Sequence, residues 1–194
     1  MKLTHQKHKG FTLVELLVVV AIIAVLAAIA TPVTLKAIAK AKITKSKAVC
    51  AALAGSVDKF ETEYNYLPFG EGEPPTQDND APIRSDDHLM AVLAGVEEDL
   101  NFKQIRFFET AEASGNKDGI VIDKSAQTAT LYDPWGELYY ILMNYDLKDG
   151  VDHPFDEGAT ISGNCAVFSI GPDGKSGSLK RIGIILLVFS LTNN

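Results

Sequence analysis

The sequence has little of what a catalytic centre usually needs. It contains four histidines, and two of them, His5 and His8, lie within the first ten residues. Neither His88 nor His153 is accompanied by a nucleophile elbow, an HExxH pair or a phosphate-binding loop. We therefore expect a protein that is not an enzyme.

Cysteine is also scarce, since Cys50 and Cys165 are the only two. They lie far apart, and neither belongs to a CxxC or Cys/His spacing, which disfavours zinc. Two interpretations remain open: one disulfide if the domain is exported, or two small buried hydrophobic side chains, which fits better.

Acidic residues are almost absent from the first 47 positions, where Glu15 is the only one. From residue 48 onward, 24 Asp and Glu outweigh 10 Lys and Arg. An acidic body repels a phosphate backbone, so we expect no nucleic-acid partner. The N-terminal lysines fall into two runs, the first at Lys2, Lys7 and Lys9 and the second at Lys36, Lys40, Lys42, Lys45 and Lys47.

One long apolar run decides the topology. Residues 11–30, FTLVELLVVVAIIAVLAAIA, contain a single charge, that of Glu15. Twenty helical residues extend about 30 Å, the thickness of the hydrocarbon core of a bilayer. The run is longer than the apolar part of an ordinary signal peptide and more uniformly aliphatic than most core helices. An ionised Glu in lipid is costly unless it is paired, so Glu15 predicts a positively charged partner.

The residues KGFTLVELLVVVAIIAVLAAIATP resemble the N-terminus of type IV prepilins and type II secretion pseudopilins. In that family a prepilin peptidase cuts after the glycine and methylates the new amino terminus. The resemblance implies a cut between Gly10 and Phe11, methylation of Phe11, and pairing of Glu15 with the amine of its own or a neighbouring subunit during filament assembly. A plain signal anchor is the alternative.

The chain is expected to comprise a cleaved basic leader at 1–10, a transmembrane and assembly helix at 11–31, a stem helix at 32–67 and a head at 68–194. Pro32 should kink the stem or open it locally, because proline lacks an N–H group. One apolar stripe of the stem is predicted to pack onto a sheet, and its members are Val49, Leu53, Val57, Phe60, Tyr64 and Leu67.

The head is predicted to have an α+β fold of pilin-like type. Residues 68–87 contain four prolines and six acids and therefore form a long exposed loop. A short helix is expected over residues 88–94, ending at Gly95. Segments rich in β-branched and aromatic residues predict one antiparallel sheet with the stem helix across one face, from strands at 119–123, 128–132, 138–147 and 160–170.

Two segments of the head extend the resemblance. DPWGELYYI at 133–141 is similar to the DPWG signature of major pseudopilins, and FSIGPDGKSG at 168–177 is similar to their glycine turn. Asp133 and Pro134 predict a tight turn. Trp135 is expected to fill the space between sheet and stem, and Gly136 to adopt a positive φ angle.

The resemblance also implies Ca²⁺ at the glycine turn, where Asp173 is the candidate ligand. No acid follows Asp173, however, so the second half of such a site is missing. Asp146, Asp149, Asp152 and Asp156 form another oxygen-rich cluster, but their spacing does not fit an EF-hand, and solvated acids are the better interpretation. The apolar segment 182–191 is too short to span a membrane and is either an extra strand or an aberrant end.

These features predict a structural subunit of a type II secretion pseudopilus. Its expected partners are other copies of itself, minor pseudopilins, the prepilin peptidase and, indirectly, the inner-membrane assembly platform with its ATPase. We expect a single-pass inner-membrane protein with a cytoplasmic N-terminus and a periplasmic head, although the five lysines after the span oppose this orientation. The alternatives are a minor type IV pilin and a membrane-anchored periplasmic ligand-binding domain.

Overall fold

The computed structural model describes residues 11–69, 82–86, 88–145, 150–154, 158–173 and 187–188. The chain forms two units, residues 1–41 and 42–194. A single helix, α1 (Leu13–Tyr64), contributes to both units. Most of the predicted loop at 68–87 lies outside the described residues.

The first unit consists of the N-terminal part of α1. This helix is long enough and apolar enough to cross a membrane. All described residues up to Ala41 are exposed, and large apolar side chains such as Leu13 and Ile29 are 79% and 64% exposed. An apolar surface of this extent is stable only against lipid or another protein.

Pro32 lies inside α1, and the helix continues on both sides of it. The hydroxyl of Thr31 donates to the Ala27 carbonyl at 2.8 Å, and that of Thr34 donates to the Ala30 carbonyl at 3.0 Å. These bonds stabilise the turn in which proline supplies no N–H donor. Of the two outcomes expected at Pro32, the structure shows a helix that continues without opening, and the kink stays a prediction.

In the second unit, α1 buries one face against the head. The predicted stripe is confirmed, since Leu53, Val57 and Phe60 are fully buried. The helix ends where Asn65 adopts a φ of 60°, a left-handed conformation common at helix C-termini. Val49 and Tyr64, also members of the stripe, pack at its margin.

The head contains the predicted short helix and strands, but in three separate ladders. Helix α2 (His88–Leu93) is followed by Gly95, whose φ of 71° ends it as expected. The largest sheet is antiparallel with the order β1-β4-β7-β8, formed by β1 (Ile83–Arg84), β4 (Tyr139–Met143), β7 (Cys165–Ser169) and β8 (Leu187–Val188). The two smaller ladders pair β2 (Gly119–Asp123) with β3 (Thr128–Tyr132) and β5 (Val151–Asp152) with β6 (Thr160–Ile161).

The expectation of one continuous sheet is thus wrong. The predicted strand at 160–170 is split into β6 and β7, because Gly163 adopts a φ of 127° between them. The predicted strand at 138–147 is shorter, since β4 ends at Met143. In the apolar segment 182–191, the described residues Leu187 and Val188 pair with β7, as an extra strand would.

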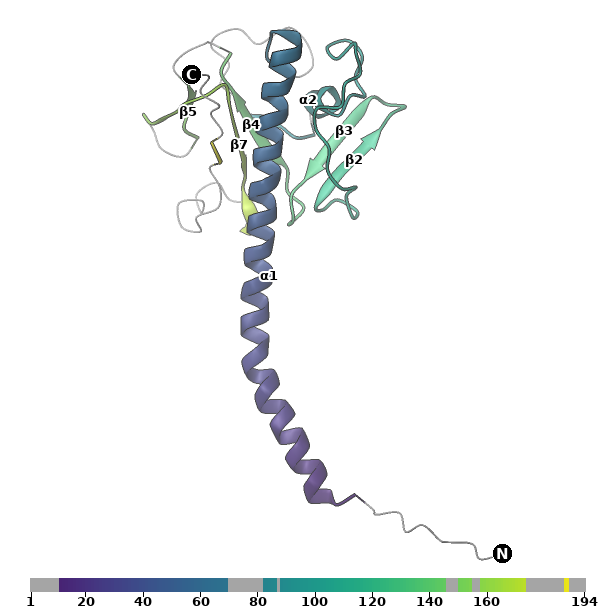
Figure 1. The fold of residues 1–194 in the computed structure, drawn as a ribbon, viewed down its shortest axis with the longest axis vertical. Coiled ribbons are helices and arrows are strands. Elements are labelled where there is room, and N and C mark those ends of the chain that lie inside the picture. Colours follow the sequence, from purple (N-terminus) through teal and green to yellow (C-terminus); the bar gives the residue numbers. More distant parts are fainter. Residues whose placement is uncertain are drawn as a thin grey trace, which may run out of the picture. The chain divides into compact units, whose positions relative to one another are not determined.

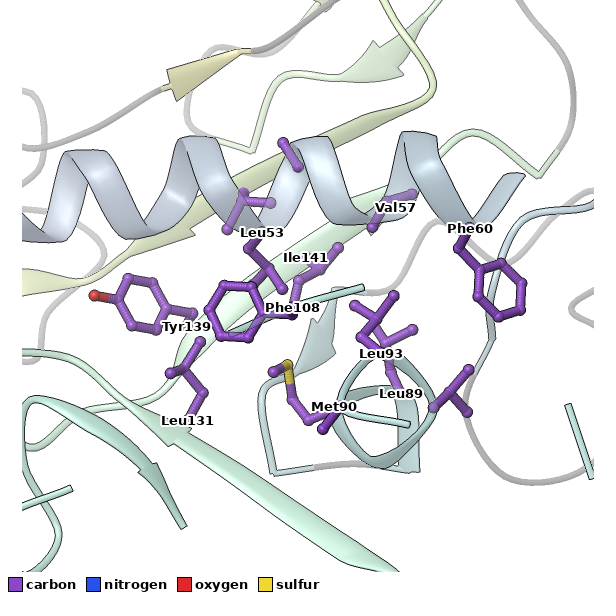
Figure 2. Close-up of a cluster of buried hydrophobic side chains, with 14 of the residues drawn as sticks. Leu53, Val57, Phe60, Leu89, Met90, Leu93, Phe108, Leu131, Tyr139 and Ile141 are labelled. Atoms are coloured by element: carbon purple, nitrogen blue, oxygen red, sulfur yellow. The ribbon is translucent and has the colours of Figure 1, made fainter. Parts of the chain in front are cut away.

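The central sheet has an apolar cluster on each face. One cluster joins side chains of α1, α2, β3, β4 and β7, and Figure 1 shows the head part of α1 lying against β4 and β7. Figure 2 shows the largest of these side chains, among them Leu53, Leu93 and Tyr139. The second cluster lies between the sheet and the β5-β6 ladder, and it comprises Leu142, Val151, Ile161, Ala166 and Phe168.

Candidate assembly site

Glu15 lies in the first turn of α1, where Thr12 holds its carboxylate. The Oε2 atom of Glu15 accepts hydrogen bonds from the backbone N–H of Thr12 at 2.9 Å and from its hydroxyl at 2.7 Å. In return, the backbone N–H of Glu15 donates to Thr12 Oγ1 at 3.2 Å. This reciprocal pair is a capping box, with Thr12 as the N-cap residue and Glu15 three residues later.

The capping box gives Glu15 a second role, which the apolar pattern around it did not predict. Both donors on Thr12 are uncharged, so the carboxylate gains hydrogen bonds but no opposite charge. The requirement for a cation in lipid therefore persists. The signal was available in the sequence as a Thr and a Glu three residues apart, directly before an apolar run.

Phe11 directly precedes this capping box and is 75% exposed. Gly10 lies outside the described residues. A cut between them would release a new amino group one residue ahead of Thr12. The position of this cut stays a prediction of the sequence.

Asp133 organises the second candidate feature, the signature turn between β3 and β4. Its side chain is fully buried, and its Oδ1 accepts hydrogen bonds at 2.9 Å from the backbone N–H groups of Trp135, Gly136 and Glu137. Its Oδ2 accepts a hydrogen bond from the hydroxyl of Ser169 at 2.5 Å. One carboxylate thus satisfies four donors, which offsets the cost of burying its charge.

The same contacts join the two segments that carried the resemblance in the head. Ser169 is the last residue of β7, and its Oγ accepts a hydrogen bond at 3.1 Å from the backbone N–H of Gly171 in the following turn. Gly136 has the expected positive φ, at 99°. A Cβ at Gly136 would lie 3.0 Å from the Asn116 carbonyl oxygen, so a larger residue would crowd that neighbour as well.

Trp135 does not fill the space between sheet and stem, contrary to the sequence expectation. Its side chain is half-buried and lies outside the main core cluster. Tyr139 is the fully buried aromatic residue beneath α1 instead (Figure 2). Tyr139 follows the DPWG signature at 133–136 after two intervening residues, and as the first residue of β4 its side chain lies in the core.

The two cysteines are free and buried in the core. Burial raises the pKa of the Cys50 thiol well above its usual range and that of Cys165 to about 12. Both thiols therefore stay protonated at neutral pH and behave as small apolar side chains.

The metal candidates are only partly described. Asp146, Asp149 and the side chain of Asp173 lie outside the described residues, and Asp152 is exposed on β5. Among the residues that the structure does describe, no three His, Cys, Asp or Glu side chains gather as a metal site. Calcium binding stays a prediction of the resemblance.

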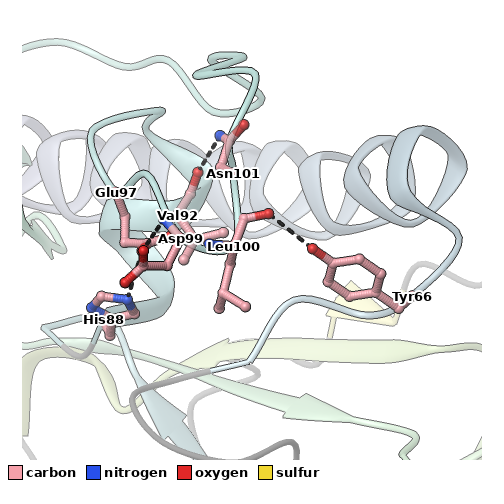
Figure 3. A network of polar contacts seen from close by, with 7 residues as sticks. All are labelled: Tyr66, His88, Val92, Glu97, Asp99, Leu100 and Asn101. Atoms are coloured by element: carbon pink, nitrogen blue, oxygen red, sulfur yellow. Dashed lines mark hydrogen bonds and ion pairs between the residues drawn. The ribbon is translucent and has the colours of Figure 1, made fainter.

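A buried polar network behind α2 was not expected from the sequence (Figure 3). Glu97 is 1% exposed, and its carboxylate accepts hydrogen bonds from the backbone N–H groups of Asp99 at 2.7 Å and Leu100 at 2.9 Å. The Nε2 atom of His88 lies 3.4 Å from Glu97 Oε1.

Asn101 continues this network towards α1. Its amide donates to the Val92 carbonyl at 2.8 Å, and its Oδ1 accepts from the hydroxyl of Tyr64 at 2.6 Å. The network thereby fixes the segment after α2 to the end of α1. The acidic sequence VEEDLN at residues 96–101 resembles a solvated surface loop. The hydrophobic pattern of the sequence therefore did not predict a buried polar network here.

Comparison with known proteins agrees with this arrangement. Residues 5–31 match the family described as the prokaryotic N-terminal methylation motif. The chain thus carries a prepilin-type N-terminal motif on a long apolar helix, its α+β fold with a small antiparallel sheet is consistent with a pilin-like fold, and the resemblance is confirmed.

A second comparison finds a relative that the chain matches over most of its length. The chain is 27% identical over 172 residues to the type II secretion system core protein G of Pseudomonas aeruginosa, strain PAO1. The alignment covers 89% of this chain and 89% of that protein. No solved structure matches the chain.

Proposed function

We propose that this protein is a structural subunit of a type II secretion pseudopilus, of the major pseudopilin type. The observation that carries the proposal is Glu15 in the first turn of an exposed apolar helix that begins with a methylation motif. Similarity to core protein G over 89% of the chain supports the secretion system, and a type IV pilin is not favoured over it.

Maturation and assembly follow from the chemistry of the N-terminus. Cleavage after Gly10 by a prepilin peptidase creates an α-amine on Phe11, which is a cation at neutral pH. In a medium of low dielectric constant, this cation and the Glu15 carboxylate attract each other strongly, within one subunit or between neighbours. The Thr12 hydrogen bonds hold the carboxylate at the helix end where the amine appears.

The exposed face of α1 supplies the surface for filament packing. Its small residues Ala24, Ala27 and Ala28 allow neighbouring helices to approach closely. We propose that the partners are other copies of this chain and minor pseudopilins. An ATP-driven platform in the inner membrane would extract the subunits.

The same helix anchors the protein in a membrane as a single pass before assembly. We place the leader in the cytoplasm, because the peptidase must reach Gly10 there, and the head in the periplasm. The second run of lysines opposes this orientation by the positive-inside rule. We keep the cytoplasmic leader because cleavage after Gly10 needs the peptidase, whereas the positive-inside rule describes only a tendency.

A membrane-anchored ligand-binding domain is the competing function. A pocket of about 210 Å³ beside β2 is lined by Glu112, Ala113, Ile120, Val121 and Ile122. It is smaller than typical small-molecule sites of about 300–1,000 Å³. An anchored receptor also has no use for a carboxylate inside its anchor, whereas a filament subunit does.

Substitution of Glu15 by Gln tests the proposed pairing. Gln preserves the capping box but removes the charge, whereas Ala removes both. We expect membrane insertion of both variants and loss of filament assembly and secretion in both. Wild-type filament yield from Glu15→Gln would contradict charge pairing and leave the cap as the role of Glu15. Glu109→Gln, at an exposed head position, serves as the matched control.

A further inference from the structure

Three aromatic residues near the C-terminal end of α1 form an exposed patch on the head. Phe102 is 66% exposed, Tyr66 is 37% exposed, and Tyr64 is half-buried. The ring centroid of Tyr64 lies 5.1 Å from that of Phe102 and 5.8 Å from that of Tyr66. The three rings are therefore contiguous and are termed the aromatic patch below. Exposed aromatic clusters of this kind often form the centre of a protein interface.

The structure holds two rings of the aromatic patch in place. The buried ring of Phe60 packs against them, with its centroid 4.6 Å from that of Tyr64 and 5.5 Å from that of Tyr66. The hydroxyl of Tyr64 donates to Asn101 Oδ1 at 2.6 Å. The hydroxyl of Tyr66 donates to the Leu100 carbonyl at 2.9 Å (Figure 3). A partner that covers these rings therefore loses little free energy to ordering them.

The chain itself shows which kind of group the aromatic patch accepts. The Nζ atom of Lys103 lies 5.6 Å from the centroid of the Tyr64 ring and 5.8 Å from that of the Phe102 ring. The same ammonium group forms an ion pair with the carboxylate of Glu63. Aromatic rings attract cations, and a nearby carboxylate adds to this attraction. The chemistry of the patch thus favours lysine or arginine side chains.

The loop that presents Phe102 also carries two acids whose charge is not neutralised. Glu98 and Asp99 are exposed and precede Phe102 by four and three residues. Among the residues that the structure describes, neither acid forms an ion pair. Glu98 accepts a hydrogen bond only from the uncharged amide of Gln104, at 2.8 Å. A cationic partner would supply the missing opposite charge.

A second copy of this chain offers a segment with matching chemistry. On α1, Val33 and Lys36 are exposed and lie three residues apart, so they share one face of the helix. Leu35 beside them is exposed as well. Lys36 forms no ion pair with any residue in the described part of the chain, and the sequence contains no acid within 16–57. Segment 33–36 thus presents one cation beside apolar side chains.

We propose that the aromatic patch of one copy binds segment 33–36 of a second copy in the filament. Lys36 of the second copy lies against the ring of Phe102, and the carboxylates of Glu98 and Asp99 supply the opposite charge. The apolar neighbours of this lysine cover the exposed rings. The inference rests on the proposed function, because the two copies meet as filament subunits, and it adds a contact of the head to the packing of the apolar helices.

Photo-crosslinking from position 102 tests the proposal in filaments assembled from the full chain. The photoreactive residue p-benzoylphenylalanine replaces Phe102 and keeps an aromatic ring there, in a host that supplies the peptidase and the assembly platform. Crosslinked dimers are isolated on a denaturing gel, so each crosslink joins two copies, and tandem mass spectrometry locates it. We expect the crosslink within segment 33–36 or directly beside it.

Variants of the partner segment test the charge. We expect Lys36→Gln to lower the yield of this dimer per filament subunit about fivefold, since it removes the cation from the aromatic and acidic surface. Lys36→Arg should retain the yield. Lys59→Gln removes one positive charge at an exposed head position and should leave the yield unchanged.

Two further measurements make the result specific. With p-benzoylphenylalanine in place of Val121, which is also exposed on the head, no crosslink to segment 33–36 is expected. Phe102→Ala should lower the filament yield about tenfold, as the loss of a central aromatic contact implies. The amount of this variant in the membrane should not change, because the side chain of Phe102 is exposed.

The outcomes separate this inference from the proposed function. Filaments whose crosslinks from position 102 reach only other segments of the chain, or another protein, would overturn the inference and leave the proposed function intact. An unchanged dimer yield in Lys36→Gln would do the same. Absence of filaments from the wild-type chain would contradict the proposed function, and this contact with it.

Discussion

The hydroxyl of Ser169 donates a hydrogen bond to the carboxylate of Asp133, with 2.5 Å between Oγ and Oδ2, and both side chains are fully buried. Asp133 begins the turn into β4, and Ser169 ends β7, so one bond ties two distant parts of the head together. Breaking it would leave polar groups without partners inside the head.

Asp133→Ala should therefore destabilise the head strongly. The change leaves the buried Ser169 hydroxyl without its acceptor and removes a shared acceptor from three partly buried backbone N–H groups, and we expect a loss of about 3 kcal/mol in the free energy of unfolding. Ser169→Ala removes one donor to Asp133 and the acceptor of the Gly171 N–H, and it should cost less, about 1–2 kcal/mol. Thermal unfolding of the full chain in detergent, followed by circular dichroism, measures both.

Asp123 offers a matched control for this prediction. Its carboxylate also accepts backbone hydrogen bonds, at 2.9 Å from Ser125 and 3.1 Å from Ala126, but it is exposed. Asp123→Ala should change the unfolding temperature little, because water replaces the lost contacts. Equal destabilisation by the Asp123 and Asp133 variants would show that burial is not what makes Asp133 important.

The sequence predicted the local elements well where their periodicity was strong. The ends of β2 and β3 agree with the expectation, because alternating apolar residues are bounded by turn residues at both ends. The buried face of α1 follows from the spacing of Leu53, Val57 and Phe60. The resemblance of the N-terminus to prepilins likewise predicted the methylation motif, which the comparison finds at residues 5–31.

Long-range features were beyond such patterns. The division of the strands into three ladders depends on which strands meet in space, and alternation within one strand does not specify this. The sequence predicted Trp135 as the aromatic residue of the core, whereas the structure buries Tyr139 there, because the pairing of β4 within the sheet decides which side chain faces α1. Glu97 and Asn101 resemble surface residues in sequence, and only the backbone groups around them explain their burial.

Thr12→Ala should fray the first turn of α1. The substitution removes the side-chain half of the capping box, while Thr12→Ser preserves it. We expect the amide of Glu15 to exchange its hydrogen about fivefold faster in the Ala variant, as a lost N-cap implies. Hydrogen exchange of the full chain in detergent measures this, and unchanged exchange would contradict the capping box.

Asp58 should make stability fall as the pH rises. Burial, reinforced by nearby Glu61, raises the pKa of this carboxyl above its ordinary 3.8, and its Oδ2 has no hydrogen-bond partner among the described residues. The folded state thus binds a proton that the unfolded state has already released. The resulting stability is lost from about pH 3.8 up through the raised pKa.

Asp58→Asn should remove this pH dependence. At pH 7 we expect the variant to melt about 2 °C higher than the wild type, after allowance for solvent screening at this partly exposed site. The difference should vanish at low pH, where both side chains are neutral. Asp99→Asn, at an exposed position, should show no gain at pH 7. A gain for Asp58→Asn that persists at low pH would exclude the charge as its cause.

Cys50 and Cys165 should resist alkylation in the folded protein. Both thiols are buried, and burial raises the pKa of each, so little reactive thiolate is present. Iodoacetamide near pH 8 should label neither before denaturation and both after it, without added reductant. Labelling that required a reductant would reveal a disulfide and contradict the free thiols.

The mature N-terminus provides the most direct test of the central claim that this chain is a processed filament subunit. Mass spectrometry of the protein from membranes of a host with the prepilin peptidase would measure its first residue and its modification. The account predicts that residues 1–10 are absent and that Phe11 carries one added methyl group. A chain that begins at Met1 and carries no methyl group would contradict it.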